Sequence, residues 1–263
     1  LMPGVPMVAV FDTAFHQTMP EKAYMYAVPH EYYEKYHIRK YGFHGTSHRY
    51  VSSHFLQITG RDPKGTKIVV CHLGNGSSIT AVKDGKCVDT TMGFTPLAGL
   101  MMGTRSGSID PSVVTYLMKK ENLTPDEMSN ILNKKSGFLG VSGLSSDSRD
   151  LVDASHEGNE RAILTCDMFR YQIKKTIGAY AAAMGGLDAV LLTGGIGENS
   201  DELRVDICEG MEFLGIELDP AKNIQHVRED LRISKDGCRT EVWVIPTNEE
   251  LAIALDTVEL ISK

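Results

Sequence analysis

The sequence predicts an α/β protein with a mixed sheet flanked by helices, and three of its features support this fold class. Two short β-rich runs, residues 79–82 and 86–90, are joined by an Asp-Gly turn at 84–85, which is a strong hairpin signal. Residues 159–184 repeat apolar side chains at helical spacing. The apolar run 188–193 is followed by glycines and a second helical pattern, an order typical of α/β folds. Because a hairpin accompanies this strand–helix pattern, we expect antiparallel and parallel strands in one sheet.

The first part of the chain should contain one short strand and several helices. Residues 8–11 have the pattern of a buried strand, whereas residues 20–40, which two prolines interrupt, should form short helices. A helix capped by Thr46 or Ser47 should follow and stop at Gly60. Its expected apolar face consists of Val51, Phe55 and Ile58.

The rest of the chain should alternate between strands and capped helices. The dipeptides at 110–111 and 124–125 are Asp-Pro and Thr-Pro, which place a capping side chain before a proline at the first helical position. Ser200 and Asn248 are further N-cap candidates. The predicted strands are 67–72, 79–82, 86–90, 188–193 and 241–245. One predicted helix is 159–184, whose apolar stripe consists of Ile163, Cys166, Phe169, Ile173, Ile177 and Tyr180. Another is 200–209, and a last helix should direct Leu251, Ile253, Ala254 and Val258 inward.

Composition excludes several classes of function. The 263 residues carry a formal net charge of -7, which argues against a general nucleic-acid binder. The 5 cysteines are odd in number and widely spaced, as is typical of free thiols in a reducing compartment, so we expect a cytoplasmic protein. No apolar run approaches the roughly 18 residues that a membrane span needs. The chain starts with Leu-Met-Pro, so we expect that it begins inside a longer protein.

Two glycine-rich turns follow predicted strands and are candidates for phosphate binding. The stretch 72–78, HLGNGSS, lies between two strands, where its glycines and side-chain donors suit an anion cradle; a plain hairpin turn is the alternative. The stretch 194–200, GGIGENS, lies between a strand and a helix, where α/β folds bind nucleotides. It has neither Walker nor Rossmann spacing, but a simple strand-to-helix turn would need one glycine and this one has three.

Several polar side chains outside these turns are candidates for catalysis or binding. Arg105 stands among five small residues, so its guanidinium should be accessible to phosphoryl oxygens; a solvated surface arginine is the alternative. His44 and His48 have the spacing of metal ligands on a helix, but no third ligand is near, so we expect a hydrogen-bond donor role for His44 and a structural role for His48. Asp12 ends a predicted strand and is catalytic, a metal ligand or a helix N-cap. The polar stretch 145–150 can reach a nucleotide or cap a helix, and the other histidines should be surface or satisfied core residues.

Seven stretches resemble one family in the order in which they occur: VFDTAFH, YGFHGTSH, CHLGNGSS, GLMMGTRSGSIDP, GLSSDSRD, LLTGGIGEN and IPTNEELAIA. Together they span nearly the whole chain and resemble the acetate kinase (acetokinase) family of the actin-like ATPase superfamily. The resemblance implies an actin-like, ribonuclease H-like ATPase domain. It also implies a phosphotransferase that uses Mg²⁺, with Mn²⁺ as an alternative ion. This enzyme would transfer a phosphoryl group reversibly between ATP and acetate, giving acetyl phosphate and ADP.

The resemblance implies a role for each matching residue. Asp12 matches the family's catalytic aspartate, and His44 and Arg105 match its transition-state stabilisers. A carboxylic acid with a pKa near ~4 is ionised at neutral pH, so acetate has no proton to lose, and we expect Asp12 to orient Mg²⁺ or its waters. Glu249 matches a magnesium ligand, with Glu250 as the second choice. The implied nucleotide contacts are His72, Leu73, Gly74, Asn75 and Gly76 of the phosphate loop, then Asp147, Ser148 and Arg149, then Gly195, Ile196, Gly197, Glu198 and Asn199 on the adenosine side, and Phe43 and Pro96 match the pocket for the acetate methyl group.

The family also implies parts that cannot be mapped onto this sequence. We expect residues 1–14 to be a remnant of an N-terminal domain, 15–249 to be a nucleotide-binding and dimerisation domain, and 250–263 to be a C-terminal helix that packs on the N-terminal domain. The chain alone should therefore be a weak or inactive kinase. The family also implies a homodimer, and we expect neither nucleic acid nor a membrane among its partners.

Three alternatives stay open at this point. A propionate or butyrate kinase would differ mainly in the volume around the methyl group, where one CH₂ changes binding by about 1–3 kcal/mol. A non-catalytic nucleotide-binding module could share the fold, although the trio Asp12, His44 and Arg105 argues against it. A metal hydrolase built on His44 and His48 would require bound zinc.

Overall fold

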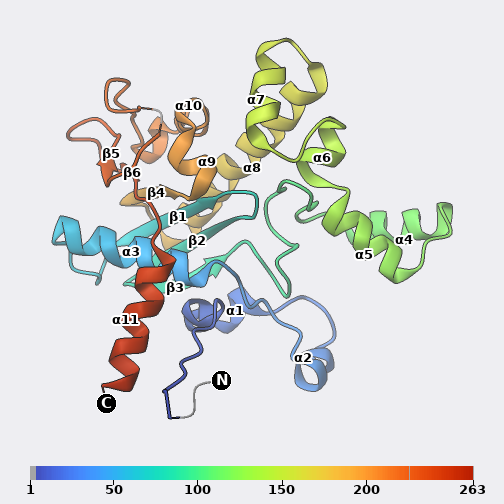
Figure 1. Cartoon of the computed structure of the whole chain (residues 1–263), viewed down its shortest axis with the longest axis horizontal. Coiled ribbons are helices and arrows are strands. Elements are labelled where there is room, and N and C mark those ends of the chain that lie inside the picture. The colour runs from blue at the N-terminus through green and yellow to red at the C-terminus, as the bar shows by residue number, and fades with distance from the viewer. Residues whose placement is uncertain (1–3, 225, 263) are drawn as a thin grey trace.

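A six-stranded mixed sheet forms the centre of the computed structural model, which describes residues 4–224 and 226–262 (Figure 1). The strand order is β3-β2-β1-β4-β6-β5. The strands are β1 (Lys67–Leu73), β2 (Ser77–Lys83), β3 (Lys86–Thr90), β4 (Ala189–Thr193), β5 (Leu231–Arg232) and β6 (Glu241–Val244).

The sheet joins an antiparallel hairpin to a parallel core, as predicted. β2 pairs with β1 and β3 in the antiparallel sense, whereas β4 runs parallel to β1 and to β6. β5 was not predicted, because two residues are too few to show any periodicity. His72 of β1 lies opposite Thr193 of β4, so both strands end at the same edge of the sheet. The turns that follow these two strands are therefore neighbours, at the edge where α/β folds bind ligands.

Most predicted helices form at or near their expected positions. Asp110, Thr124, Asn159, Ser200 and Asn248 each accept a backbone N–H bond with the side chain at a helix start, as N-caps do. The helical elements are η1 (Ala14–Thr18), α1 (Glu21–Tyr24), α2 (Glu31–Tyr36), α3 (Gly45–Thr59), α4 (Pro111–Lys120), α5 (Pro125–Lys134), α6 (Gly137–Ser142), α7 (Ser148–His156), α8 (Glu160–Met184), α9 (Gly194–Asn199), α10 (Asp201–Cys208), η2 (Glu212–Leu214) and α11 (Glu249–Ile261).

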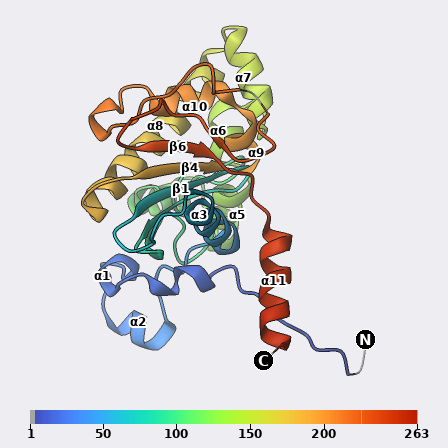
Figure 2. The same ribbon diagram turned by 90° about the vertical axis from the view of Figure 1, so that its left-hand side faces the viewer.

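The two sides of β1 pack against different helices (Figure 2). Val69 and Cys71 belong to the core cluster that contains the buried residues of α8. Ile68 and Val70, which point the other way, pack with buried residues of α3. Full burial of a Val or Ile side chain stabilises a fold by about 1.5–3 kcal/mol. Alternate residues of one strand therefore hold both layers in place, which explains why β1 reads as one continuous apolar run.

Residues 8–11 do not form the buried strand predicted from their apolar run. They have no regular secondary structure, and Phe11 is 68% exposed. A strand forms only where another strand offers its free edge, and within residues 4–224 and 226–262 none pairs with this segment. The apolar run is typical of a strand, but the sequence pattern does not show whether another strand is available to pair with it.

The predicted inward faces of three helices are only partly correct. In α8 the stripe is buried from Phe169 onward, but Ile163 near its start is exposed, as is Ile58 near the end of α3. α11 projects away from the sheet (Figure 2), and among its residues 249–261 only Ala252 is buried. Helical periodicity marks an apolar face, but it does not say which element covers that face. The residues of α11 that were predicted to point inward and are exposed here are Leu251, Ile253, Ala254 and Val258.

The glycine-rich stretch after β4 is a short helix, α9, and not the loop that the sequence predicted. Gly194 has a φ of +78°, and a Cβ on this residue would lie 2.8 Å from the carbonyl oxygen of Leu73. Glycine is therefore required at this position both by the backbone conformation and by the close approach of β1. The residues that follow continue as helix until Ser200 caps α10.

Two expectations from composition concern the whole chain. All 5 cysteines are free thiols, as their spacing predicted. Among the described residues, no helix is both long enough and apolar enough to cross a membrane.

Candidate active site

The turn between β1 and β2 is a hairpin turn that also presents unused backbone donors. The Gly74 N–H donates to the Gly76 carbonyl oxygen (3.1 Å), and the Ser77 hydroxyl donates to the Gly74 carbonyl oxygen (2.9 Å). No group within the described residues accepts a hydrogen bond from the N–H of Asn75 or of Gly76. Neighbouring free N–H groups in a turn can bind an anion. The hairpin interpretation is therefore confirmed, and it is compatible with a phosphate cradle.

A cavity of about 860 Å³ opens beside this turn, a size within the usual range of small-molecule sites. The backbone of Gly74 approaches α9 closely, since a Cβ on Gly74 would lie 4.0 Å from the Gly195 nitrogen. This contact follows from the shared edge of β1 and β4. The predicted residues that line the cavity are Gly74, Asn75, Asp147, Ser148, Arg149, Gly195, Ile196 and Asn199, and they are joined by unpredicted ones from α7, α8 and α10, among them His156, Cys166, Phe169, Arg170 and Glu202.

The rim of the cavity carries an ion pair at the start of α7. Asp147 caps this helix by accepting the N–H of Arg149 (2.9 Å), and its carboxylate also receives the Arg149 guanidinium (2.6 Å). Hydrogen bonds from Arg149 hold the pKa of the Asp147 carboxyl below its ordinary value. The helix-cap alternative for this stretch is thus confirmed. Because the Arg149 side chain is 86% exposed, its guanidinium remains accessible to a ligand in the cavity.

His44 begins α3 in a backbone conformation that residues other than glycine rarely adopt, with a φ of 60°. Asp12 stabilises this start from a distant part of the chain. Its Oδ2 accepts the N–H of His44 (2.8 Å), and its Oδ1 accepts the N–H of Thr46 (3.2 Å). The prediction that Thr46 or Ser47 caps α3 is therefore wrong, because the carboxylate of Asp12 satisfies the first donors of the helix. Asp12 is not the N-cap residue that the alternative interpretation expected, since His44 holds that position in α3, but its carboxylate accepts backbone N–H groups at the start of this helix.

His44 and Arg105 converge over the turn that follows β1. A Cβ on Gly76 would lie 3.3 Å from His44 Nε2 and 3.5 Å from Arg105 Nη2. The other terminal nitrogen of Arg105, Nη1, donates to the carbonyl oxygen of Pro96 (2.9 Å) and contacts Met102 Sδ (3.4 Å). These contacts hold the guanidinium from behind and leave Nη2 directed at the turn. Arg105 is half-buried, so the solvated surface arginine considered above does not fit.

The imidazole of His44 is stacked on a second ring. Its centroid lies 4.2 Å from that of His72, with 23° between the ring planes. Burial lowers the pKa of His44, and the positive charge of Arg105 adds to this effect, although Asp12 opposes it. Burial also lowers the pKa of His72 to about 3. Both rings are therefore neutral at neutral pH, and His44 acts as a hydrogen-bond donor or acceptor without carrying a charge.

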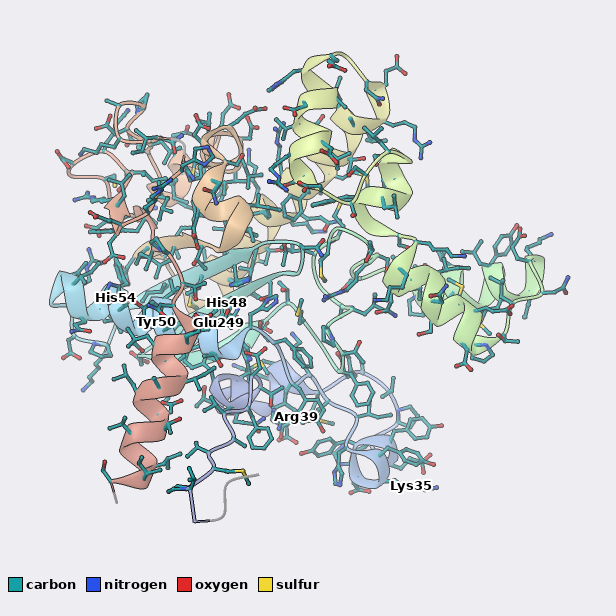
Figure 3. The ribbon with its side chains drawn as sticks, viewed as in Figure 1. Lys35, Arg39, His48, Tyr50, His54 and Glu249 are labelled. Carbon is teal, nitrogen blue, oxygen red and sulfur yellow. The ribbon has the colours of Figure 1, made fainter. Side chains whose placement is uncertain are left out.

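Asp12 and Glu249 form a pair of carboxylates beside this cluster. Glu249 is the first residue of α11, which packs against α3, the helix that carries His48 (Figure 3). Burial raises the pKa of Glu249, and the negative charges of Asp12 and Glu250 raise it further. Two carboxylates that repel each other in a desolvated site suit a divalent cation. Among the described residues, no group of three His, Cys, Asp or Glu side chains gathers to hold a metal ion. Mg²⁺ is usually bound by one or two carboxylates together with phosphate oxygens, and the two carboxylates present here are compatible with that ligand set.

The model of the Acetokinase family matches residues 1–255. The chain belongs to this family. It is similar to an acetate kinase of Clostridium botulinum, with 60% identity over 262 residues that cover 99% of the chain and 66% of that protein. An acetate kinase of Caldanaerobacter subterraneus is 62% identical over 262 residues, which cover 99% of the chain and 65% of that protein.

Solved structures of an acetate kinase and of a propionate kinase share this fold. The crystal structure of Porphyromonas gingivalis acetate kinase superposes with a TM-score of 0.96 at 52% identity, over 98% of this chain and 65% of that one. A propionate kinase from Francisella tularensis gives a TM-score of 0.89 at 45% identity, over 96% of this chain and 64% of that one. The chain thus spans about 65% of the length of the relatives it matches.

Two residues predicted to contact ligands, Glu198 and Pro96, lie outside the lining of the cavity. Glu198 does not face the cavity as a nucleotide contact would: its Oε1 accepts the N–H of Gly194 (2.8 Å), the Thr193 hydroxyl (3.2 Å) and the N–H of Thr247 (3.4 Å). Glu198 therefore anchors α9 to the segment before α11. Pro96 lies at the surface.

Sequence reasoning missed the residues behind His44. Ser78 bonds both His44 and His48, and His16, expected to be unremarkable, is buried against His48 with 5.7 Å between ring centroids. His48 is fully buried, in agreement with the structural role predicted for it. The sequence places His16, His44, His48 and His72 in three of the stretches singled out above, but it does not indicate which rings share a partner.

Proposed function

We propose that this acetokinase chain carries the nucleotide-binding and phosphoryl-transfer site of an acetate kinase. The observation that carries the proposal is the convergence of His44 Nε2 and Arg105 Nη2 on Gly76, in a turn with free N–H groups at the end of a cavity of nucleotide size. These side chains come from sequence positions 44 and 105. They would be required to meet around a phosphoryl group.

The reaction needs alignment and charge stabilisation and no proton transfer. A carboxylate oxygen of acetate attacks the γ-phosphorus of ATP, and the bond between that phosphorus and the β–γ bridging oxygen breaks, giving acetyl phosphate and ADP. The equatorial oxygens carry negative charge throughout. Arg105 Nη2 and a ring N–H of His44 would donate to these oxygens, and each such preorganised donor is worth about 10²–10³ in rate. The reverse reaction uses the same groups.

Asp12 and Glu249 would hold Mg²⁺ or its waters, with Mn²⁺ as an alternative ion. The bound ion would neutralise charge on the nucleotide phosphates. Asp12 is suited to this role because, among the described residues, each of its oxygens accepts one N–H bond, which leaves a lone pair for a further partner. Glu249 suits the same role, because burial and the charges of Asp12 and Glu250 raise its pKa and a bound cation would offset them.

The nucleotide would occupy the cavity with its phosphates toward the turn after β1. The end of β1 would contribute His72 and Leu73, and the turn itself would contribute Gly74, Asn75 and Gly76. The stretch 147–149 and the cavity-facing residues of α9 would contact the adenosine, and the acetate methyl group would lie between Phe43 and Pro96. We further propose a cytoplasmic homodimer in which residues 15–249 bind nucleotide and dimerise, and in which 1–14 and 250–263 pack with an N-terminal domain. On this proposal the 263-residue chain alone turns over poorly.

One variant pair tests the catalytic assignment in the intact protein. Arg105→Ala should lower kcat for acetyl phosphate formation by about 10²–10³-fold while the affinity for ADP changes by less than about threefold. The matched control is Arg239→Ala, which removes an exposed arginine whose guanidinium donates to the Phe213 carbonyl oxygen. Equal kinetics of the Arg105 variant and the wild type would contradict the proposal.

A propionate kinase is the second candidate, because a propionate kinase structure shares the fold at 45% identity. The two candidates differ by one CH₂ beside the methyl pocket, a difference worth about 1–3 kcal/mol. Comparison of kcat/KM for acetate, propionate and butyrate decides between them.

A further inference from the structure

Ser78, at the start of β2, links two imidazoles through one hydroxyl. Its Oγ lies 2.8 Å from His44 Nδ1 and 2.7 Å from His48 Nε2. The carbonyl oxygen of Phe43 is a third neighbour, at 3.3 Å. A hydroxyl has one proton to donate and otherwise accepts. The protonation of one ring therefore constrains the protonation of the other.

His48 determines which way this hydroxyl points. The ring is fully buried, and burial holds its pKa well below the ordinary value, so it is neutral and carries one proton. Its Nδ1 is buried and has no hydrogen-bond partner among the described residues. A buried N–H without an acceptor costs about 1–3 kcal/mol, and an unpaired lone pair is tolerated better. The proton of His48 therefore lies on Nε2, which donates to Ser78.

The remaining proton of Ser78 is then available for His44. Two acceptors compete for it, His44 Nδ1 at 2.8 Å and the Phe43 carbonyl oxygen at 3.3 Å. The shorter contact is the stronger one, since typical O–H hydrogen bonds are about 2.5–3.0 Å long. If Nδ1 of His44 accepts, the proton of the neutral ring lies on Nε2. This is the nitrogen that faces Gly76, and no described residue accepts a hydrogen bond from it.

We propose that Ser78 and His48 are positioning residues that hold His44 as its Nε2–H tautomer, a neutral donor aimed at the phosphoryl oxygens. The tautomer rests on these hydrogen bonds and on the burial of His48, whereas its consequence for catalysis rests on the proposed function. His44 keeps its proton throughout the reaction. A ring with the proton on Nδ1 would direct a lone pair at the same oxygens and repel them.

The tautomer is measured directly by NMR on the protein labelled with ¹⁵N-histidine, without any assay of activity. Long-range ¹H–¹⁵N correlations distinguish the two tautomers, and His44→Gln assigns the signals by removing one ring. We expect His44 and His48 both to be protonated on Nε2. Protonation of His44 on Nδ1, or of His48 on Nδ1, would overturn the proposal whether or not the protein is a kinase.

Variants of Ser78 test its role. Ser78→Ala should move the His44 tautomer toward Nδ1–H and lower kcat in the intact protein by about 10–100-fold, a partial loss of one donor. KM for the nucleotide should stay within about threefold, and Ser78→Thr, which keeps the hydroxyl, should restore the tautomer. The control is Ser52→Ala, which removes a buried hydroxyl whose partners among the described residues are the backbone carbonyl oxygens of His48 and Arg49. An unchanged tautomer in Ser78→Ala would refute the role of Ser78, and the wild-type spectrum still decides the assignment if that variant does not fold.

Discussion

Replacing Gly76 by alanine places one methyl group where the phosphoryl oxygens should lie. Gly76 does not have a positive φ, so alanine is compatible with its backbone. The new Cβ would lie 3.3 Å from His44 Nε2 and 3.5 Å from Arg105 Nη2, contacts that a shift of a few tenths of an ångström relieves. The fold should therefore tolerate the change. The proposed site should not tolerate the change, because the methyl group would separate His44 and Arg105 from the phosphoryl oxygen to which both would donate.

The expected fall in kcat follows from the hydrogen-bond donors that the phosphoryl group would lose. One preorganised donor is worth about 10²–10³ in rate, or roughly 2.7–4 kcal/mol, so Gly76→Ala should lower kcat by at least this factor. Thermal unfolding should change little, since roughly 1 kcal/mol shifts Tm by only about 2–4 °C in a chain of this size. The assay is acetyl phosphate formation coupled to a colorimetric trap, run on the intact protein beside a melting curve.

A second glycine provides the control. Gly178 lies inside α8, and a Cβ there would meet nothing within 4 Å. Gly178→Ala should stabilise the helix by about 0.5–1 kcal/mol and leave turnover unchanged. If Gly76→Ala retains kcat within about threefold of the wild type, the phosphoryl group does not pass over Gly76, and the reasoning from convergence fails.

Three further predictions concern the proposed metal ligand Asp12, the pH dependence of stability and the buried guanidinium of Arg204. Asp12→Asn should weaken Mg²⁺ binding in the presence of ADP by about 10–100-fold, measured by calorimetry, and an unchanged affinity would remove Asp12 from the metal site. Burial lowers the pKa of His16 to about 4 and that of His72 to about 3, below the ordinary 6.5. As the pH falls, these two histidines are therefore protonated in the unfolded chain before they are protonated in the folded protein. The contribution of these neutral histidines to the free energy of unfolding is therefore fully present above pH 6.5 and is lost as the pH falls toward the folded pKa values. The loss should reach roughly 2 kcal/mol per histidine at pH 5. Equal denaturation midpoints at pH 8 and at pH 5 would disprove this. Arg204→Met should destabilise the fold by about 2–4 kcal/mol in urea unfolding, because the fully buried guanidinium donates to the carbonyl oxygens of Gly197 and Ile224, which would lose their partner.

The elements that the sequence predicted well are those whose signals are local. The hairpin over β2 and β3, the caps of α4 and α5 and the length of α8 each depend on residues a few positions apart. The elements that it predicted poorly depend on partners elsewhere. Residues 8–11 and α11 have apolar faces, but periodicity does not reveal what would cover them.

The same distinction holds for the candidate site. Glycine-rich turns and an arginine among small residues are visible locally, and the structure brings Arg105, His44 and the turn after β1 together. The cap on α3 comes from Asp12, 32 positions before His44, and no local pattern indicates such a contact. Ser78 escaped notice for a related reason, since a hydroxyl next to a glycine turn is an ordinary turn residue until its two imidazole partners are known.

The parallel pairing of β1 with β4 has a thermodynamic consequence. Because it brings the turns after both strands to one edge, a single ligand in the cavity would contact segments from distant parts of the chain. Such a ligand binds the native state and not the unfolded chain, so at 100 times its dissociation constant it adds about 2.7 kcal/mol to the free energy of global unfolding. Nucleotide should therefore slow amide hydrogen exchange in strands that it never touches.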